Sequence, residues 1–150
     1  MKMEEEMKSE ELKDKLIESL GKIYYMEAFN QLAEFLQGEL YVLYFLSQNR
    51  GIEINPSILS DKLHISRPRI TAALSALRRK GYVETELSKD DRRRILVMLT
   101  LEGLSYIEKK QKNVEKNFTL FVEGLGEKNS TELIRLIDLT VDIMSTNENN

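Results

Sequence analysis

Two helix-start signals lie only eleven residues apart in the middle of this chain. Asn55 precedes Pro56, and Ser66 stands two residues before Pro68. Asn and Ser are favoured just before a helix, and proline suits its first turn because no N–H donor is needed there. The interval has room for one short helix and a tight turn. A longer helix should follow and end at Gly81, since glycine readily adopts the left-handed backbone that closes a helix.

The flanking sequence predicts helices on both sides and one β-hairpin. Apolar residues recur at helical spacing before and after the middle segment, whereas two β-prone runs enclose a polar turn. The expected helices cover 9–33, 38–48, 56–63, 67–80, 101–122 and 130–144, and the expected strands cover 82–87 and 95–99. We therefore expect a mostly α fold with a small β-hairpin wing, a winged helix-turn-helix with terminal dimerisation helices.

The helix boundaries rest on local signals. Ser9 is expected to cap the first helix, which makes the acidic start of the chain a frayed extension. Thr100 should cap the helix that follows the hairpin. Gly124 and Gly126 should separate that helix from the last one.

Length and composition favour one domain over 1–150. The winged helix-turn-helix would occupy about 38–100. The helices at about 9–35 and 104–145 hold more apolar residues than one helix face needs, and a lone subunit would expose them as a patch. The sequence therefore predicts a homodimer formed by the terminal helices.

The charge is distributed unevenly along the chain. Residues 60–99 carry ten Lys and Arg and five acids, a net charge of +5, whereas the other 110 residues carry twelve basic and twenty acidic side chains, a net charge of −8. A basic segment in an acidic protein is typical of a surface that faces a polyanion. Arg92, Arg93 and Arg94 concentrate this charge in the turn of the hairpin.

The helix after Ser66 is predicted to have two different faces. Ile70, Leu74 and Leu77 can pack against Ile58, Leu59 and Leu63 of the short helix, while small and basic residues lie on the other side. Small residues let a helix enter the major groove, and its first turn can reach base edges and phosphates. The predicted DNA-binding residues of this helix are Ser66, Arg67, Pro68, Arg69, Thr71, Ala72, Ser75 and Arg79. The hairpin adds Asp91, Arg92, Arg93 and Arg94, of which at least one arginine should enter the minor groove.

These residues resemble the multiple antibiotic resistance regulator (MarR) family over 59–103. The wing motif, Asp-x-Arg followed by Leu-Thr-x-x-Gly, is met by Asp91, Arg93, Leu99, Thr100 and Gly103. The resemblance implies an obligate homodimer with intertwined terminal helices, each lobe reading half of a palindromic operator. It also implies that Asp91 orients Arg93 for the minor groove. Ala72 departs from the long polar or basic residue that many members place there, which shifts the expected base reading to Arg67 and Arg69.

A tyrosine-rich segment has two interpretations. The first is packing in the core and dimer; the second is one wall of a pocket for a small phenolic or lipophilic effector, as in many MarR-like proteins. The residues of this possible effector pocket are Tyr24, Tyr25, Phe29, Tyr41 and Tyr44.

Other functions lack the residues they need. The chain has no cysteine and one histidine, which excludes a thiolate metal site and a paired nucleophile and base. No glycine-rich phosphate loop is present, and the longest uncharged stretch, ten residues after Glu39, is too short for a membrane span. We expect a cytoplasmic transcriptional regulator, a repressor released by a small ligand, with no enzymatic activity, metal or cofactor. The alternative is a winged helix that binds proteins instead of DNA.

Overall fold

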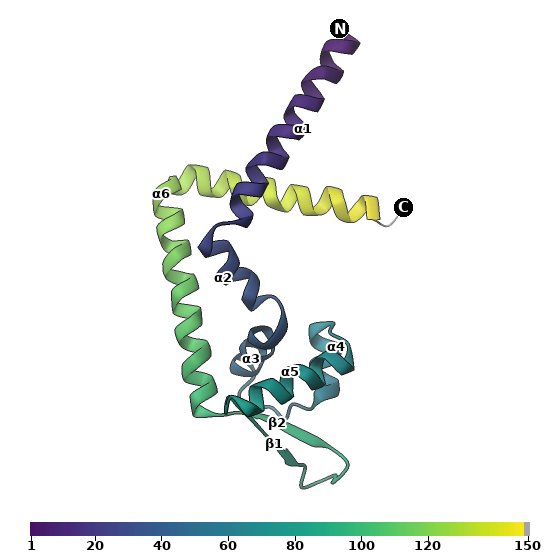
Figure 1. The fold of residues 1–150 in the computed structure, drawn as a ribbon, viewed down its shortest axis with the longest axis vertical. Coiled ribbons are helices and arrows are strands. Elements are labelled where there is room, and N and C mark those ends of the chain that lie inside the picture. Colours follow the sequence, from purple (N-terminus) through teal and green to yellow (C-terminus); the bar gives the residue numbers. More distant parts are fainter. Residues whose placement is uncertain (149–150) are drawn as a thin grey trace. The chain divides into compact units, whose positions relative to one another are not determined.

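The computed structural model describes residues 1–148, and the chain forms two compact units, the first ending at Gln111 and the second beginning at Lys112. Its elements are shown in Figure 1. In chain order they are α1 (Lys2–Tyr24), α2 (Glu27–Phe35), α3 (Gly38–Gln48), α4 (Pro56–Leu63), α5 (Arg67–Arg79), β1 (Val83–Leu87), β2 (Ile95–Leu99) and α6 (Leu101–Glu148). The expected mostly α fold with a hairpin wing is confirmed. No helix within the described residues combines the length and apolar character that a membrane span needs.

Helices α4 and α5 form the expected helix-turn-helix. The Asn55 side chain accepts a hydrogen bond from the backbone N–H of Ile58 at 2.8 Å, so it caps α4 as predicted. His64 closes α4 in the left-handed conformation (φ 53°). The turn is held by the Ser60 hydroxyl, which donates to the Ile65 carbonyl at 2.6 Å. Local hydrogen bonds thus fix how α5 leaves α4.

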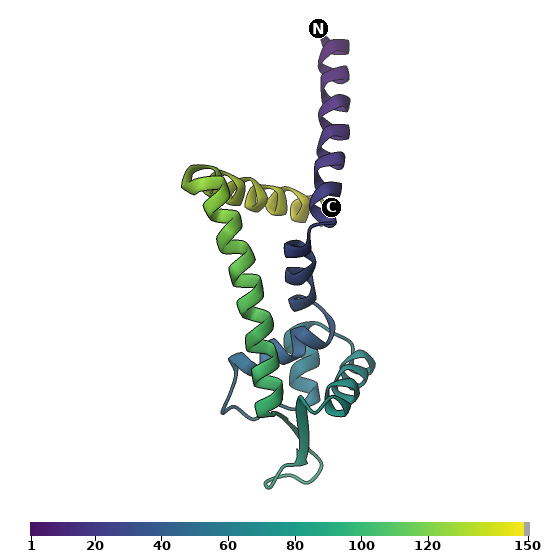
Figure 2. The same cartoon turned by 60° about the vertical axis from the view of Figure 1, so that its left-hand side comes forward.

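The core of the first unit lies where α3, α4 and α5 meet the hairpin (Figure 2). The apolar face of α5 is buried as predicted, together with Leu59 and Leu63 of α4, whereas Ile58 is half-buried. The side chains that are almost fully enclosed are Val42, Leu43, Leu59, Ile70, Leu77, Val83 and Ile107. This burial fixes which side of α5 faces inward.

The hairpin is a two-stranded antiparallel sheet with Val83 opposite Leu99 and Leu87 opposite Ile95. The N–H of Val97 also donates to the Ile54 carbonyl at 2.8 Å, which ties β2 to the segment before α4. Strand β1 contacts α5 and strand β2 contacts α4, so the root of the hairpin is attached to the helix-turn-helix, while Leu87 and Ile95 near the turn are exposed.

Thr100 and Gly103 join the hairpin to α6. The Thr100 hydroxyl accepts the N–H of Gly103 at 3.0 Å, which confirms the predicted cap, and donates to the Gly81 carbonyl at 2.6 Å. Gly103 lies against Tyr82 so closely that a Cβ atom would stand 2.1 Å from the Tyr82 carbonyl oxygen. A residue with a side chain cannot occupy this position unless the backbone shifts.

The N-terminal helices differ from the prediction. The helix expected over 9–33 is two helices, because Tyr25 leaves the helical conformation and Met26 is extended (φ −74°, ψ 132°). Helix α1 also begins at Lys2, so Ser9 lies inside it and does not cap it. The acidic start is helical rather than frayed, which Glu4 and Glu5 favour because they lie at the positive end of the helix dipole.

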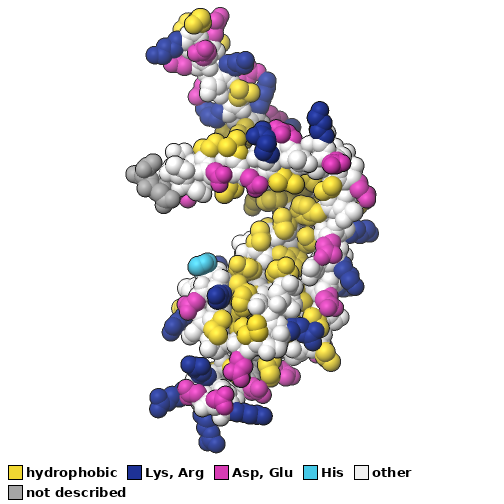
Figure 3. Space-filling view, turned by 180° about the vertical axis from the view of Figure 1, so that it is seen from behind, with side chains coloured by type: hydrophobic (Ala, Val, Ile, Leu, Met, Phe, Trp, Pro, Cys, Tyr) yellow, Lys and Arg dark blue, Asp and Glu magenta, His cyan; other side chains and the backbone are white. Residues whose placement is uncertain are grey.

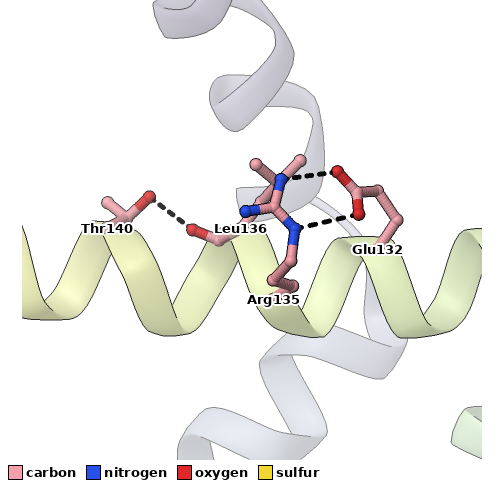
Figure 4. Close-up of polar contacts among 4 residues, drawn as sticks. All are labelled: Glu132, Arg135, Leu136 and Thr140. Carbon is pink, nitrogen blue, oxygen red and sulfur yellow. Dashed lines mark hydrogen bonds and ion pairs between the residues drawn. The ribbon is translucent and has the colours of Figure 1, made fainter.

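The second unit contains the rest of α6. Gly124 stays helical, and the predicted break is limited to Gly126, whose backbone (φ 77°, ψ 166°) is open almost only to glycine. Beyond it, Arg135 donates two hydrogen bonds to Glu132, at 2.7 and 3.0 Å, and the Thr140 hydroxyl donates to a backbone carbonyl at 2.8 Å (Figure 4). The bond from Arg135 lowers the pKa of Glu132.

Candidate nucleic-acid interface

The outer face of α5 carries most of the predicted DNA-binding residues. At about 100° per residue, Arg69, Ala72 and Arg79 lie on the side away from the buried face, and all three are exposed. Ser75 is half-buried on the same side. Arg67 is exposed too, but the same geometry places it on the flank of the helix. The outer face thus combines short side chains with two arginines.

The arginines of α5 differ in their partners. Arg78 donates to the Thr85 hydroxyl in β1 at 3.5 Å. Among the described residues, no hydrogen bond or ion pair engages the side chains of Arg67, Arg69 or Arg79. These three guanidinium groups keep their donors available to an outside acceptor.

Two hydroxyls at the start of α5 are placed differently. Ser66 occupies the position before the helix, but its hydroxyl makes no capping bond, contrary to the prediction that it caps α5. The Thr71 hydroxyl donates back to the Arg67 carbonyl at 3.0 Å. The Ser66 hydroxyl and the first N–H groups of α5 are thus left for another acceptor, next to the exposed Pro68.

The turn of the hairpin is a compact loop with a buried centre. Ser88 is 4% exposed; its N–H donates to the Arg94 carbonyl at 2.9 Å and its hydroxyl accepts the N–H of Asp90 at 3.3 Å. The N–H of Arg94 donates to the carbonyl of Asp91 at 2.9 Å. A backbone held in this way projects its side chains in fixed directions.

Asp91 organises the arginines of this loop. Its carboxylate accepts the backbone N–H of Arg93 at 3.0 Å and lies 3.9 Å from the guanidinium Nε of Arg94. It therefore holds Arg93 through the main chain, and its ion pair is with Arg94. The side chains of Arg92 and Arg93 are exposed, and Figure 3 shows Lys and Arg side chains gathered around the tip of the hairpin.

The tyrosine-rich segment is divided between two aromatic pairs. The rings of Tyr24 and Tyr25 lie edge to face with their centroids 5.4 Å apart, and those of Phe35 and Tyr44 do so with their centroids 5.7 Å apart. Among the described residues no ring contact connects the two pairs. Tyr25 is 83% exposed and Phe29 is 38% exposed, whereas Tyr41 is half-buried. A cavity of about 160 Å³ lies elsewhere, between the end of α3 and β2, lined by Leu46, Asn49, Arg50, Gly51, Ile52, Ile54, Val97, Met98 and Leu99.

Comparison with known proteins identifies this architecture. Residues 36–94, from the end of α2 to the end of the hairpin turn, match the MarR family. This part of the chain is therefore similar to the MarR family.

Two curated proteins show the extent of this likeness. PapX from Escherichia coli, an HTH-type transcriptional regulator, is 35% identical over 68 residues, which are 45% of this chain and 42% of PapX. YetL from Bacillus subtilis, an HTH-type transcriptional repressor, is 26% identical over 103 residues, 61% of this chain and 62% of YetL. The chain thus aligns with less than two thirds of the length of either protein.

A solved structure extends the likeness in fold to nearly the whole chain. FabT from Streptococcus pneumoniae, in complex with DNA, is 17% identical with a TM-score of 0.66, over 89% of this chain and 97% of FabT. At this identity the likeness shows the fold alone, terminal helices included.

The MarR wing motif has a structural explanation that the sequence alone does not provide. Asp91 shapes the turn of the hairpin, whereas Thr100 and Gly103 attach the end of β2 to α6 beside Tyr82. Sequence reasoning also missed Ser88, whose only signal is a serine where the first strand meets the turn.

Proposed function

We propose that this protein is a DNA-binding transcriptional repressor of the MarR family, in which α5 enters the major groove of a double-stranded operator. The observation that carries the proposal is the free outer face of α5. There the small side chains of Ala72 and Ser75 lie between Arg69 and Arg79, which no described residue engages. A face used only for solvation would normally carry long charged side chains along its whole length.

The residues of this face contact different parts of the DNA in the proposal. Ala72 and Ser75 let the helix approach the bases, and Arg69 reads a guanine through two parallel hydrogen bonds. The Ser66 hydroxyl and the first N–H groups of α5 bind a phosphate at the positive end of the helix dipole. Arg67 and Arg79 flank the groove and bind the sugar-phosphate backbone.

The hairpin is the second DNA-binding element of the proposal. Arg93 enters the adjacent minor groove while Arg92 and Arg94 lie near its phosphates. The hydrogen bond that the Asp91 carboxylate accepts from the Arg93 N–H supports this role, because it orders the tip before DNA is present. An ordered tip loses less conformational entropy on binding than a mobile one.

The exposed apolar residues of the terminal helices support a homodimer. No residue of α1 is buried, although Leu12, Leu16, Ile17 and Leu20 are each 55–63% exposed. The second unit exposes Ile134, Ile137, Val141 and Met144 to a similar degree. We propose that a second copy of the chain covers both sets, and that the two lobes read the halves of a palindrome.

The proposed dimer predicts that a charged side chain on the apolar face of α1 weakens dimerisation. Changing Leu16 to lysine should weaken dimerisation by about 3–6 kcal/mol, or at least about 100-fold, because two leucines are lost from the interface. Asp14→Lys puts the same side chain on the opposite face of α1 and should leave the dimer intact. Sedimentation equilibrium of both variants measures the difference; a Leu16→Lys protein as dimeric as Asp14→Lys would argue against this interface.

We also propose that a small phenolic or lipophilic effector releases the protein from DNA. The exposed aromatic rings of Tyr24, Tyr25 and Phe29 support an apolar binding wall where α1 is followed by α2. No metal or cofactor is part of the proposal, and a repressor of this kind acts in the cytoplasm, where it meets the chromosome.

The proposal is tested by DNA binding at several salt concentrations. The wild-type protein should bind duplexes selected from genomic fragments with an affinity that falls steeply as salt rises. Arg93→Ala should weaken selected and random duplexes alike and lower the salt slope by about two per dimer, because a minor-groove arginine carries little base information. Fluorescence anisotropy measures both quantities. Absence of binding at every salt concentration would favour the protein-binding alternative.

A further inference from the structure

The C-terminal end of α5 is attached to its surroundings by polar contacts. The Nζ of Lys80, just after α5, donates to a Glu39 carboxylate oxygen in the first turn of α3 at 2.5 Å, and this bond raises the pKa of Lys80. The next two residues bind Thr100: its hydroxyl donates to the Gly81 carbonyl, and its N–H donates to the Tyr82 carbonyl at 3.1 Å. The end of α5 is therefore linked to α3 and to the start of α6.

An aromatic stack extends this link to α2. The rings of Tyr82 and Tyr106 are nearly parallel (16°), with their centroids 4.5 Å apart. The Nζ of Lys110 lies 5.7 Å from the Tyr106 centroid and 3.8 Å from a carboxylate oxygen of Glu34 in α2. A continuous series of contacts thus runs from the end of α5 through Tyr106 to α2.

This series is distinct from the core and from the DNA-binding face. Tyr82 and Tyr106 are half-buried, whereas the enclosed core is made by other side chains such as Val83 and Ile107. Neither tyrosine belongs to the outer face of α5 or to the hairpin turn. The stack therefore lies outside the enclosed core, beside the attached end of α5.

A small change in the direction of α5 would displace its first turn by a large distance. Helix α5 has 13 residues, so it is about 20 Å long. A rotation of about 5° about its attached end would displace its first turn, which carries the reading residues, by nearly 2 Å. Recognition groups lose their function when they stray by much more than about 0.5 Å.

We propose that Tyr106 is a positioning residue for DNA recognition: its stack on Tyr82, supported by Lys110 and Glu34, fixes the angle of α5 relative to α2 and the first turns of α6. The proposal rests on the proposed DNA-binding function and adds a residue that touches no DNA. It assigns to these half-exposed side chains a role in specificity rather than in stability.

The test compares Tyr106→Leu, which removes the ring, with Tyr106→Phe, which keeps it. The probe is a duplex that the wild-type protein selects from a random library, with an unselected duplex of equal length as reference. Tyr106→Leu should weaken the selected duplex about tenfold and leave the unselected duplex and the salt slope unchanged, because no phosphate contact is lost. Tyr106→Phe should bind within about twofold of the wild type, since the stack remains.

Hydrogen exchange gives a second measurement that needs no DNA. The amide hydrogens of Lys80, Gly81 and Tyr82 bond to carbonyls of the last turns of α5. They should exchange faster in Tyr106→Leu than in Tyr106→Phe. If Tyr106→Leu does not fold, Lys110→Met and Glu34→Gln interrupt the same series at a half-buried and an exposed position, and they should show the same two effects in weaker form.

Three results would overturn the proposal. Wild-type affinity of a folded Tyr106→Leu protein would show that the stack does not guide α5. A smaller salt slope in that variant would indicate that the residues around Tyr106 contact DNA phosphates instead. Unchanged exchange at the end of α5 would show that the stack does not hold it. A wild-type protein that selects no duplex would contradict the proposed function, while the exchange experiment would still test the link between Tyr106 and α5.

Discussion

Arg69→Ala is expected to weaken binding to a selected operator by about 2–6 kcal/mol per dimer, because each half-site loses a guanine contact of about 1–3 kcal/mol. The expected loss of affinity is therefore roughly 30-fold to 10⁴-fold. Random DNA should lose much less, since an arginine that reads a base edge contributes mainly where that base is present. The exposure of Arg69 on the outer side of α5, with no partner among the described residues, makes it the strongest candidate reader.

Competition titrations on operator and random duplexes measure this difference. Arg50→Ala is a suitable control, because it removes the same charge from the segment between α3 and α4, outside the proposed interface. It should change operator affinity by less than about twofold. Equal weakening of operator and random DNA by Arg69→Ala would make Arg69 a phosphate contact and leave Arg67 or the start of α5 as the reader.

Gly103→Ala is expected to lower the free energy of unfolding by about 3 kcal/mol, at the upper end of the cost of overpacking. The added Cβ would stand 2.1 Å from the Tyr82 carbonyl oxygen and 2.9 Å from Leu99, so the start of α6 must move away from the root of the hairpin. Such a shift also strains the hydrogen bond from the Thr100 N–H to the same carbonyl. For a chain of this length the melting temperature should fall by roughly 6–12 °C.

The same helix provides a matched control for this experiment. At Gly124 no atom lies within 4 Å of an added Cβ, and the backbone is helical. Gly124→Ala should therefore be neutral or stabilise the protein by up to about 1 kcal/mol. Thermal unfolding followed by circular dichroism measures both variants. Similar melting temperatures for the two would mean that the contact between Gly103 and Tyr82 does not constrain this junction.

Much of the fold could be predicted because its boundaries depend on local chemistry. Asn55 with Pro56 marks the start of α4 in a way that needs no distant partner, and the ends of α3, α4 and β2 fall where the sequence places them. The break at Met26 could not be found, because apolar residues continue at helical spacing across it and neither glycine nor proline stands there.

The candidate site could be predicted in outline but not in detail. The two faces of α5 follow from helical periodicity, so the buried and exposed residues agree with expectation. The partner of the Asp91 carboxylate depends on the backbone path of the turn, which brings it to the Arg93 N–H and the Arg94 guanidinium. The stacking of Tyr82 on Tyr106 could not be predicted either. The two residues are 24 positions apart in the chain, and their contact depends on where α6 begins.

The backbone of Gly126 has a consequence for how this protein tolerates mutation. Every missense change of one nucleotide in a glycine codon introduces a Cβ atom, and the conformation seen here (φ 77°, ψ 166°) excludes nearly all such residues. The helical alternative is open to them and would turn the bend within the second unit into uninterrupted helix. A point mutation at this position would redirect the part of α6 that follows it, residues 127–148, as one piece, while every contact within that part stayed intact.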